Sequence, residues 1–182
     1  MSSLTLLNET AYVAQFVVFN GDLITARVPG IAPGAQLQVP TDSTYQITAT
    51  TIIDGNTYST APLDVSGAVS FLAQVKQNRQ QGTYDFEVQM GPSTVADRME
   101  FQKTTIGPVT FTIAKNGVPL QTVVVTNSFV TKTLKLSDTH AVYAVINGVT
   151  TDTVTTNDPN ATVRALLDTS NLEFGYFTLS VD

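Results

Sequence analysis

The sequence has no cysteine and a single histidine, His140, among its 182 residues. Because zinc sites are built mainly from several Cys and His side chains, we predict no metal site, and no pattern in the chain indicates a cofactor. A chain without cysteine forms no disulfide bond, which suits a reducing compartment but also a secreted fold of this size. Charged residues make up only 13% of the chain, about half of the usual share, so Thr, Ser, Asn and Gln must supply much of the polar surface.

No basic stripe and no long apolar run is visible in the sequence, and we expect no signal peptide. The net charge is −6, which argues against nucleic acid as a partner. The first seven residues lack the basic and apolar regions of a signal peptide, and no apolar run approaches the length of a membrane-spanning helix. We therefore expect a protein that is cytoplasmic, or exported without a conventional signal peptide.

Short strand-like runs separated by two-residue turns make up most of the chain. The clearest run is Tyr84 to Met90, in which apolar side chains alternate with Asp85, Glu87 and Gln89 as on a half-buried strand. Asn-Gly and Asp-Gly between such runs favour type I′ hairpin turns, because both central residues of that turn need φ > 0. Four such pairs occur, at Asn20-Gly21, Asp54-Gly55, Asn116-Gly117 and Asn147-Gly148. The sequence therefore predicts an all-β fold.

Three pairs of features recur in the same order with a nearly constant spacing. Asn20-Gly21 and Asn116-Gly117 lie 96 residues apart, the other two Gly-containing turns lie 93 apart, and Tyr84 and Tyr176 lie 92 apart. A nearly fixed period indicates internal duplication. Since short strands with frequent turns are typical of β-sandwiches, we predict two tandem β-sandwich units of about seven strands each. The alternative is one larger sandwich or barrel in which the halves share sheets.

Composition also suggests where these units begin and end. The expected order is a first unit over 1–91, a linker over 92–107 and a second unit over 108–182. Two segments fit either a strand or a short helix, namely 67–75, for which we favour the strand, and 161–167. The last strand is expected over 174–181.

Residue types used in catalysis occur, but not in convergent arrangements. Ser137, Asp138 and His140 lie within four residues, whereas a nucleophile, a base and an orienting carboxylate usually come from separate elements. We expect His140 to be an exposed strand residue instead. Asp85 and Glu87 share one strand face about 7 Å apart, which a glycosidase could use, but a solvated outer face is the simpler interpretation. We predict that the protein is not an enzyme.

An oxygen-rich stretch precedes one predicted strand and contains Asp152, Asn157, Asp158 and Asn160. Calcium takes such ligands, but the spacing does not match an EF-hand loop. Asn and Asp beside proline are typical of turns, because their side chains hydrogen-bond to the nearby backbone. We therefore interpret this stretch as a turn.

One tyrosine is well placed to bind a ligand. Tyr58 follows the Asp54-Gly55 turn, and a tyrosine ring joins an apolar face, which can stack on a sugar, to a polar tip. Most of the other tyrosines alternate with Val, Ile and Phe and are better assigned to the core. Tyr58, Asp54 and Asn56 are therefore the candidate ligand-binding residues.

Three hypotheses about function remain. The leading one is a non-enzymatic β-sandwich binding protein that recognises a carbohydrate or a protein surface. The second is a membrane-active or pore-forming toxin-like protein, for example an insecticidal one, because Val123 to Thr133 and Gly148 to Thr156 are rich in Thr and low in charge. The third is a structural or assembly protein, for which a homo-oligomer would be the sign.

Overall fold

The structure is a computed structural model that describes residues 2–170 and 176–182. The regular elements of these residues are β-strands arranged in four open sheets, which confirms the all-β prediction. Both ambiguous segments are strands, β8 (Val69–Asn78) and β17 (Thr162–Leu167). No helix in the described part of the chain is long and apolar enough to cross a membrane.

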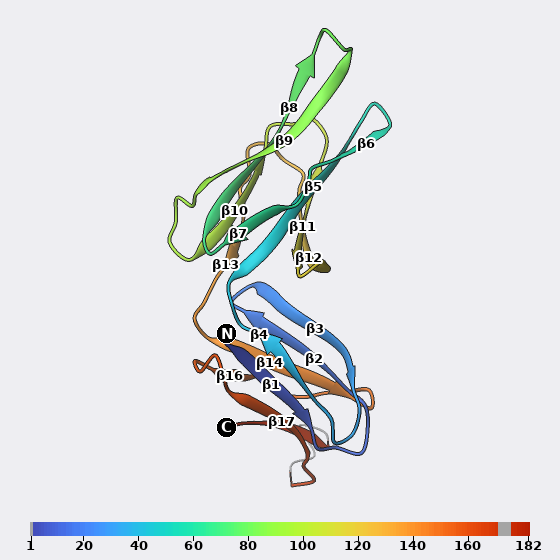
Figure 1. Cartoon of the computed structure of the whole chain (residues 1–182), viewed down its shortest axis with the longest axis vertical. Helices are drawn as coiled ribbons and strands as arrows, with labels where there is room; N and C mark the ends of the chain where they lie inside the picture. The colour runs from blue at the N-terminus through green and yellow to red at the C-terminus, as the bar shows by residue number, and fades with distance from the viewer. Residues whose placement is uncertain (1, 171–175) are drawn as a thin grey trace. The chain divides into compact units, whose positions relative to one another are not determined.

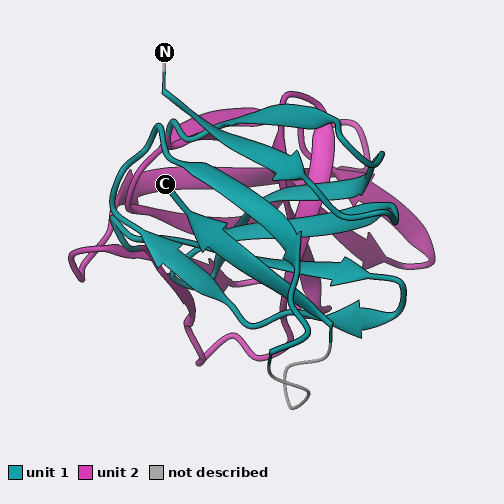
Figure 2. Ribbon diagram, turned by 90° about the horizontal axis from the view of Figure 1, so that it is seen from below, with its two compact units in different colours: residues 1–42, 137–182 teal, residues 43–136 magenta. Residues whose placement is uncertain are grey.

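The chain divides into two compact units (Figure 2). Unit 1 comprises residues 1–42 and 137–182, and unit 2 comprises residues 43–136. Unit 2 is therefore one continuous piece of chain. Unit 1, in contrast, is assembled from two segments that precede and follow unit 2 in the sequence.

This division differs from the sequential one that the composition suggested. Part of the expected linker is a strand, β10 (Arg98–Lys103), because Met99 and Phe101 alternate along it and are fully buried. Strand pairing also crosses the expected boundary, as where Ala49 lies opposite Phe111. The sequence did not predict β10, because charged residues flank and separate Met99 and Phe101.

The described part of unit 1 forms two sheets. Its strands are β1 (Ser3–Asn8), β2 (Ala14–Asn20), β3 (Leu23–Ile31), β4 (Gln36–Pro40), β14 (His140–Ile146), β15 (Val149–Thr150), β16 (Val154–Thr156), β17 and β18 (Phe177–Val181). One sheet has the order β18-β17-β1-β4, in which β1 and β17 run parallel, as Figure 1 shows. The other has the order β15-β14-β2-β3, and β16 also pairs with β14. Residues 174–175, where the last predicted strand begins, lie outside the described residues.

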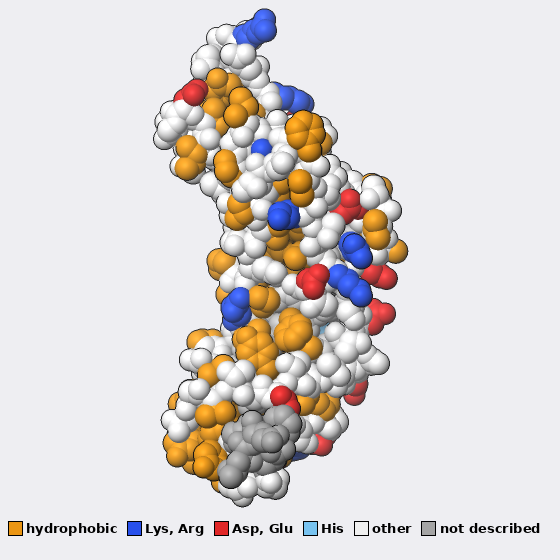
Figure 3. Space-filling model, turned by 180° about the vertical axis from the view of Figure 1, so that it is seen from behind, with side chains coloured by type: hydrophobic (Ala, Val, Ile, Leu, Met, Phe, Trp, Pro, Cys, Tyr) orange, Lys and Arg blue, Asp and Glu red, His pale blue; other side chains and the backbone are white. Residues whose placement is uncertain are grey.

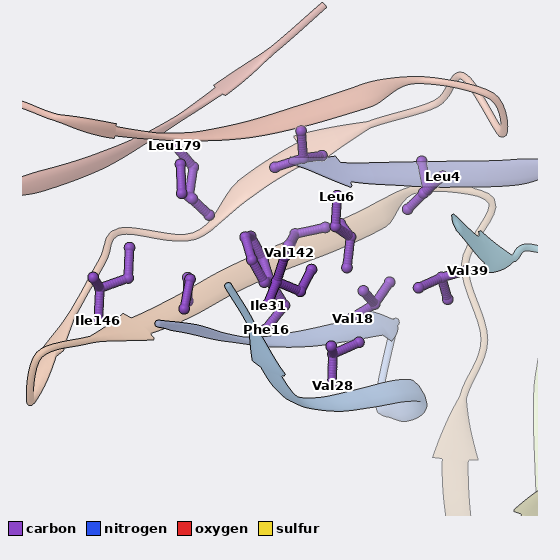
Figure 4. Close-up of a cluster of buried hydrophobic side chains, with 14 of the residues drawn as sticks. Leu4, Leu6, Phe16, Val18, Val28, Ile31, Val39, Val142, Ile146 and Leu179 are labelled. Atoms are coloured by element: carbon purple, nitrogen blue, oxygen red, sulfur yellow. The ribbon is translucent and has the colours of Figure 1, made fainter. Parts of the chain in front are cut away.

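The core of unit 1 joins its two sheets (Figure 4). Leu4 and Leu6 are the buried positions of β1, and Phe16 and Val18 are buried positions of β2, because alternate side chains of a strand point to the same face. In Figure 4 the labelled side chains from the two sheets point toward one another. The buried residues of this cluster come in equal numbers from the two chain segments, eight from each.

The described residues of unit 2 also form two sheets. The strands are β5 (Thr44–Ile53), β6 (Asn56–Ser59), β7 (Leu63–Ser66), β8, β9 (Thr83–Pro92), β10, β11 (Val109–Lys115), β12 (Val118–Val125) and β13 (Lys132–Lys135). One sheet has the order β12-β11-β5-β6, with β7 also paired to β5, and the other has the order β13-β10-β8-β9. Strands β8 and β9 form a long hairpin (Figure 1).

Three phenylalanines lie at the centre of unit 2. Phe71 on β8 and Phe101 on β10 are stacked, with ring centroids 5.2 Å apart. Phe111 on β11, in the other sheet, lies 5.1 Å from Phe101 and 6.5 Å from Phe71. All three side chains are fully buried. Their burial removes large apolar surfaces from water and so holds the two sheets together.

Three of the four predicted type I′ turns are confirmed, since both central residues have positive φ at Asp54-Gly55, Asn116-Gly117 and Asn147-Gly148. The fourth prediction is displaced by one residue. Asn20 pairs with Leu23, so the central residues are Gly21, with φ of 62°, and Asp22, which is not among the residues with positive φ. Positive φ at the first central residue alone is the pattern of a type II′ turn. Asn20 stays in the strand, and its side-chain oxygen accepts a hydrogen bond from the Ser137 backbone N–H at 2.5 Å.

The two units share one order of strand pairing. The order β12-β11-β5-β6 of unit 2 corresponds to β3-β2-β14-β15 of unit 1, and β13-β10-β8-β9 corresponds to β4-β1-β17-β18. The central pair of the second sheet is parallel in both units. The hairpins β2–β3 and β11–β12 also carry a β-bulge at corresponding places, Thr25 and Leu120.

A threonine beside the central strand makes the same contacts in each unit. In unit 1 the Thr151 hydroxyl accepts a hydrogen bond from Ala144 N–H at 3.0 Å, and Thr151 N–H donates to the Ala144 carbonyl at 2.9 Å. In unit 2 Thr60 does the same with Ala49, at 3.0 Å and 2.9 Å. Each threonine thereby satisfies both backbone groups of the alanine opposite it.

Candidate functional site

Two large hydrophobic side chains of unit 2 are fully exposed to solvent. Ile106 has 105% and Phe129 has 97% of the reference exposure, more than any other exposed large hydrophobic residue in the described chain. Ile106 lies in the loop 104–108 between β10 and β11, and Phe129 lies in the loop 126–131 between β12 and β13. We call these two loops the apolar loop pair.

A buried lysine ties the two loops together. Lys103, the last residue of β10, is 2% exposed, and its Nζ donates to the Thr105 carbonyl at 2.7 Å and to Ser128 Oγ at 3.1 Å. The Ser128 hydroxyl in turn donates to the same Thr105 carbonyl at 3.2 Å. One ammonium group therefore bridges the loop that carries Ile106 and the loop that carries Phe129.

Further hydrogen bonds fix the backbone of each loop. In the first, the Thr105 hydroxyl donates to the Gly107 carbonyl at 2.8 Å. A Cβ on Gly107 would lie 3.2 Å from the Ile52 carbonyl, so the loop approaches β5 more closely than most side chains permit. In the second loop, Phe129 N–H donates to the Asn127 side-chain oxygen at 2.8 Å. The exposed side chains are thus presented on ordered backbone, which lowers the entropy lost when a partner binds.

Asn8 occupies the position in unit 1 that Lys103 occupies in unit 2. Its Nδ2 donates to the carbonyls of Tyr12 and Ile31, at 2.7 Å and 2.8 Å, and it is fully buried. In unit 1 one buried side chain therefore ties the counterpart loop 9–13 to the end of β3. The difference lies in how much apolar surface the loops present, since Tyr12 and Val13 are only 47% and 55% exposed, and Tyr12 makes an edge-to-face contact with Phe177.

The sequence did not single out the apolar loop pair. Ile106 had been placed in the linker and Phe129 within the Thr-rich run from Val123 to Thr133, whereas in the structure β12 ends at Val125 and β13 begins at Lys132. The available signal was the Asn127-Ser128 pair ahead of Phe129, because Asn and Ser commonly form turns through their side chains.

The predicted ligand-binding residues lie at the end of the β5–β6 hairpin. Asp54 and Asn56 are exposed at the turn, and Tyr58 is half-buried. The Tyr58 ring makes an edge-to-face contact with Tyr84 of β9, with centroids 6.4 Å apart and planes at 89°. The structure thus pairs Tyr58 with a second tyrosine from the other sheet. Part of the surface that was expected to stack on a sugar lies against Tyr84 instead.

The Ser137–His140 segment leads from a local turn into β14. The Ser137 hydroxyl accepts a hydrogen bond from Thr139 N–H at 3.1 Å, as in a local turn. The prediction that His140 is exposed is wrong, because its residue exposure is only 7%. His140 opens β14, which lies between β2 and β16, and it pairs with Asn20 on one side and Thr156 on the other.

The carboxylate of Glu87 is held by an ion pair. Lys76 Nζ lies 2.8 Å from its Oε1, and Gln74 Nε2 donates to the same oxygen at 2.7 Å. The hydrogen bond from Lys76, followed by that from Gln74, holds the pKa of Glu87 below its ordinary value. A glycosidase general acid needs a raised pKa, so the charge state of Glu87 opposes that role beside Asp85.

The oxygen-rich stretch is engaged in turn hydrogen bonds. Asp158 Oδ1 accepts from Asn160 N–H at 2.9 Å, and Asn157 Oδ1 accepts from the Thr139 hydroxyl at 2.7 Å. Asn160 Oδ1 accepts from Ser3 N–H at 3.2 Å and so ties β1 to this turn. Within residues 2–170 and 176–182, no group of three His, Cys, Asp or Glu side chains could hold a metal ion.

A shallow hollow in unit 2 and the charged surface in Figure 3 are two further candidates for a binding site. A shallow hollow of about 310 Å³ in unit 2 is lined by β7 and the ends of β8 and β9, with Asp64 as its one carboxylate beside Val65 and Met90. On the face shown in Figure 3, Lys and Arg side chains lie among Asp and Glu side chains and do not gather in one patch. Neither surface offers an acid–base pair or a strong field of one sign.

Comparison with known proteins gives no further guide, because no protein-family model, no curated protein and no solved structure matches this chain. The apolar loop pair is thus the feature from which a function can be argued.

Proposed function

We propose that this chain is a non-enzymatic binding protein that recognises a protein surface through the apolar loop pair. The observation that carries the proposal is the full exposure of Ile106 and Phe129 on loops bridged by Lys103. Large apolar side chains gain free energy when a partner covers them, and binding energy at interfaces is concentrated in a few such residues. Covering each of them contributes roughly 1.5–3 kcal/mol, which corresponds to about a tenfold to hundredfold gain in affinity.

The chemistry of the loops favours a protein over a carbohydrate. Sugars are recognised by flat aromatic faces together with several polar groups, whereas Ile106 is aliphatic and its neighbours Thr105 and Ser128 spend their hydroxyl groups within the loops. Tyr58, the better candidate for a sugar, shares its ring surface with Tyr84. An apolar pocket on another protein fits the loop pair more closely.

The absence of a catalytic role is part of the same proposal. Glu87 is ion-paired to Lys76, and His140 is buried between two neighbouring strands of a sheet. These arrangements support a protein whose groups bind rather than react.

Single substitutions in the loops test the proposal. The chain carrying Phe129→Ser or Ile106→Ser is compared with Val13→Ser, because Val13 is 55% exposed in the corresponding loop of unit 1. The immobilised unaltered chain first captures candidate proteins from an extract of its source, and each candidate is then purified and titrated directly. We expect Phe129→Ser to weaken binding at least tenfold and Val13→Ser to leave it unchanged.

Two other binding assays separate the alternatives. Glycan arrays and flotation with neutral and anionic vesicles are run on the same three variants. Glycan binding that survives Phe129→Ser would overturn the choice of protein as the partner and return attention to Tyr58. Vesicle binding lost with Phe129→Ser would show instead that the loops insert into lipid, as exposed apolar side chains at an interface can do.

We infer, in addition, that each unit is a β-sandwich and that the two units descend from duplication of one nine-strand unit. The shared pairing order, the bulges at Thr25 and Leu120 and the matching contacts of Thr60 and Thr151 support this history. Independent origins would have to reproduce all three features. Their agreement is simplest if both units inherited them.

A further inference from the structure

Unit 1 is completed by two pieces of chain that are joined covalently only through unit 2. The N segment (residues 1–42) contributes β1 to β4, and the C segment (residues 137–182) contributes β14 to β18. The segments meet in both sheets, through the parallel pair β1–β17 and the antiparallel pair β2–β14. No turn within unit 1 connects one segment to the other.

Neither segment can bury its apolar side chains alone. The N segment divides its strands between the two sheets, and its core residues Leu6 and Phe16 belong to a cluster to which the C segment contributes half of the members, among them Val142 and Val163. Separation of the segments would expose this cluster to water. Each segment therefore needs a partner with the surface of the other.

Polar contacts make that partner specific. Arg164 of β17 lies 3.0 Å from Glu9 of the N segment and also contacts the Asp182 carboxylate. The hydrogen bonds that Arg164 donates, first to Asp182 and then to Glu9, hold its pKa above the ordinary value. Asn20 accepts a hydrogen bond from Ser137, and the Thr41 hydroxyl donates to the Pro159 carbonyl at 3.1 Å. A segment that formed these contacts would have to carry this same sequence.

Unit 2 is likewise built from two sets of strands that pair with each other in both sheets. Its strands β5 to β9 lie in the first half of the sequence and its strands β10 to β13 in the second half, and they join through the parallel pair β8–β10 and the antiparallel pair β5–β11. In each unit, four strands from one half of the chain thus complete five strands from the other half. The chain already exchanges segments between its own halves.

We propose that two copies of this chain exchange their N segments, so that residues 1–42 of each copy complete unit 1 of the other. The exchange needs only the two-segment construction of unit 1 and stands whether or not the apolar loop pair binds a protein. Every contact within unit 1 is kept, and only residues 41–43 between β4 and β5 must change their path, with Asp42 and Ser43 exposed. Reciprocal exchange produces a closed symmetric dimer.

Concentration decides which form is populated. Within one chain the two segments have an effective concentration on the order of millimolar, as expected for closely tethered partners. The closed monomer therefore prevails in dilute solution, and the exchanged dimer forms when the chain folds at comparable concentrations. Once formed, it persists, because its dissociation requires unit 1 to open.

Two single-cysteine variants provide the test, since the chain has no cysteine of its own. Thr5 on β1 and Thr162 on β17 are opposite each other in the parallel register, and neighbouring strands lie about 4.8 Å apart, within the range of a disulfide. The variants Thr5→Cys and Thr162→Cys are mixed at about 1 mM in denaturant, refolded together and mildly oxidised. The matched control pairs Thr5→Cys with Thr178→Cys, because Thr178 lies on β18, which β17 separates from β1.

We expect at least tenfold more mixed disulfide dimer from Thr5→Cys with Thr162→Cys than from the control pair. The double variant in a single dilute chain shows that the positions can join, since it should form the same bond within the monomer. If that bond forms and the mixed dimer does not exceed the control, the exchange is refuted.

The unaltered chain gives a second readout that does not depend on cysteine. Refolding at about 1 mM should yield a species of twice the monomer mass with unchanged near-ultraviolet circular dichroism. It should survive dilution and return to monomer only under conditions that unfold unit 1. A dimer that dissociates promptly on dilution, or the absence of a dimer, would contradict the proposal.

Discussion

Replacement of Phe101 by alanine removes the middle ring of the three-phenylalanine cluster in unit 2. Phe101 is fully buried, and its ring lies 5.2 Å from Phe71 and 5.1 Å from Phe111. Truncation of a buried Phe to Ala costs about 3–5 kcal/mol, and two aromatic contacts with good geometry are lost together. We expect the free energy of unfolding to fall by about 4 kcal/mol, a large part of the usual total of roughly 5–15 kcal/mol.

Phe129→Ala is the matched control, because it removes the same atoms from a side chain that is 97% exposed. Little apolar surface returns to water in that case, so the free energy of unfolding should change by less than about 0.5 kcal/mol. Urea denaturation followed by circular dichroism measures both variants against the unaltered chain, with the slope of the transition checked for constancy. The two phenylalanines thus separate a contribution to folding from a contribution to binding.

Either of two results would refute this reasoning. A loss below about 1 kcal/mol for Phe101→Ala would mean that β10 does not pack its ring between the sheets. A loss above about 1 kcal/mol for Phe129→Ala would mean that this ring is covered in the folded protein, and the apolar loop pair would then lose its main residue.

Three further outcomes follow from single contacts. Lys103→Met leaves the Thr105 carbonyl without its charged donor, so the unfolding free energy should fall by about 1–3 kcal/mol and amide exchange in residues 104–108 should accelerate; unchanged exchange would contradict the bridging role. Hydrogen bonds from Ser93 and then Thr94 hold the pKa of Glu100 below its ordinary value of 4.5, so its stabilising effect exists above that pH and disappears as the pH falls below it. Glu100→Gln should therefore be less stable than the unaltered chain at pH 7 and equal to it in acid, and urea titrations that differ equally at both pH values would count against this. Thr60→Val and Thr151→Val remove corresponding hydroxyl groups and should each cost about 1–2 kcal/mol, whereas unequal losses would weaken the correspondence between the units.

Local sequence patterns predicted much of the strand content. Phe111 and Ile113 alternate with polar neighbours, which is the pattern of a half-buried strand, and both are fully buried in β11. The Asn116-Gly117 turn that follows it is type I′, because Asn and Gly tolerate positive φ. These features depend on a few neighbouring residues, so a short stretch of sequence is sufficient to predict them.

The turn expected at Asn20-Gly21 does not follow from its dipeptide alone. Its dipeptide is the same as Asn116-Gly117, yet the turn is displaced to Gly21-Asp22. Asn20 accepts a hydrogen bond from Ser137, which lies 117 residues away in the sequence. The position of this turn therefore accompanies a contact with a residue far away in the sequence, which the dipeptide alone does not reveal.

The candidate site was harder to anticipate than the strands. Exposure of Ile106 and Phe129 depends on which neighbouring surface covers each loop, and composition carries no information about that. The bridge from Lys103 to Ser128 likewise joins residues whose proximity follows from the pairing of β10 with β13 and from the path of the loops. Lys103 lies in the expected linker over 92–107, and nothing in the sequence around it indicates that its side chain is buried.

The positions of the strands and of most turns thus follow from short stretches of sequence. Which strands pair with one another is decided only by the tertiary structure. Thr5 pairs with Thr162, and Ala49 pairs with Phe111, across long stretches of intervening chain. Many strands offer similar edges and alternating faces, so periodicity alone cannot choose among them. Burial of the core side chains that both segments of a unit contribute favours these pairings, because separated segments would leave that core exposed to water.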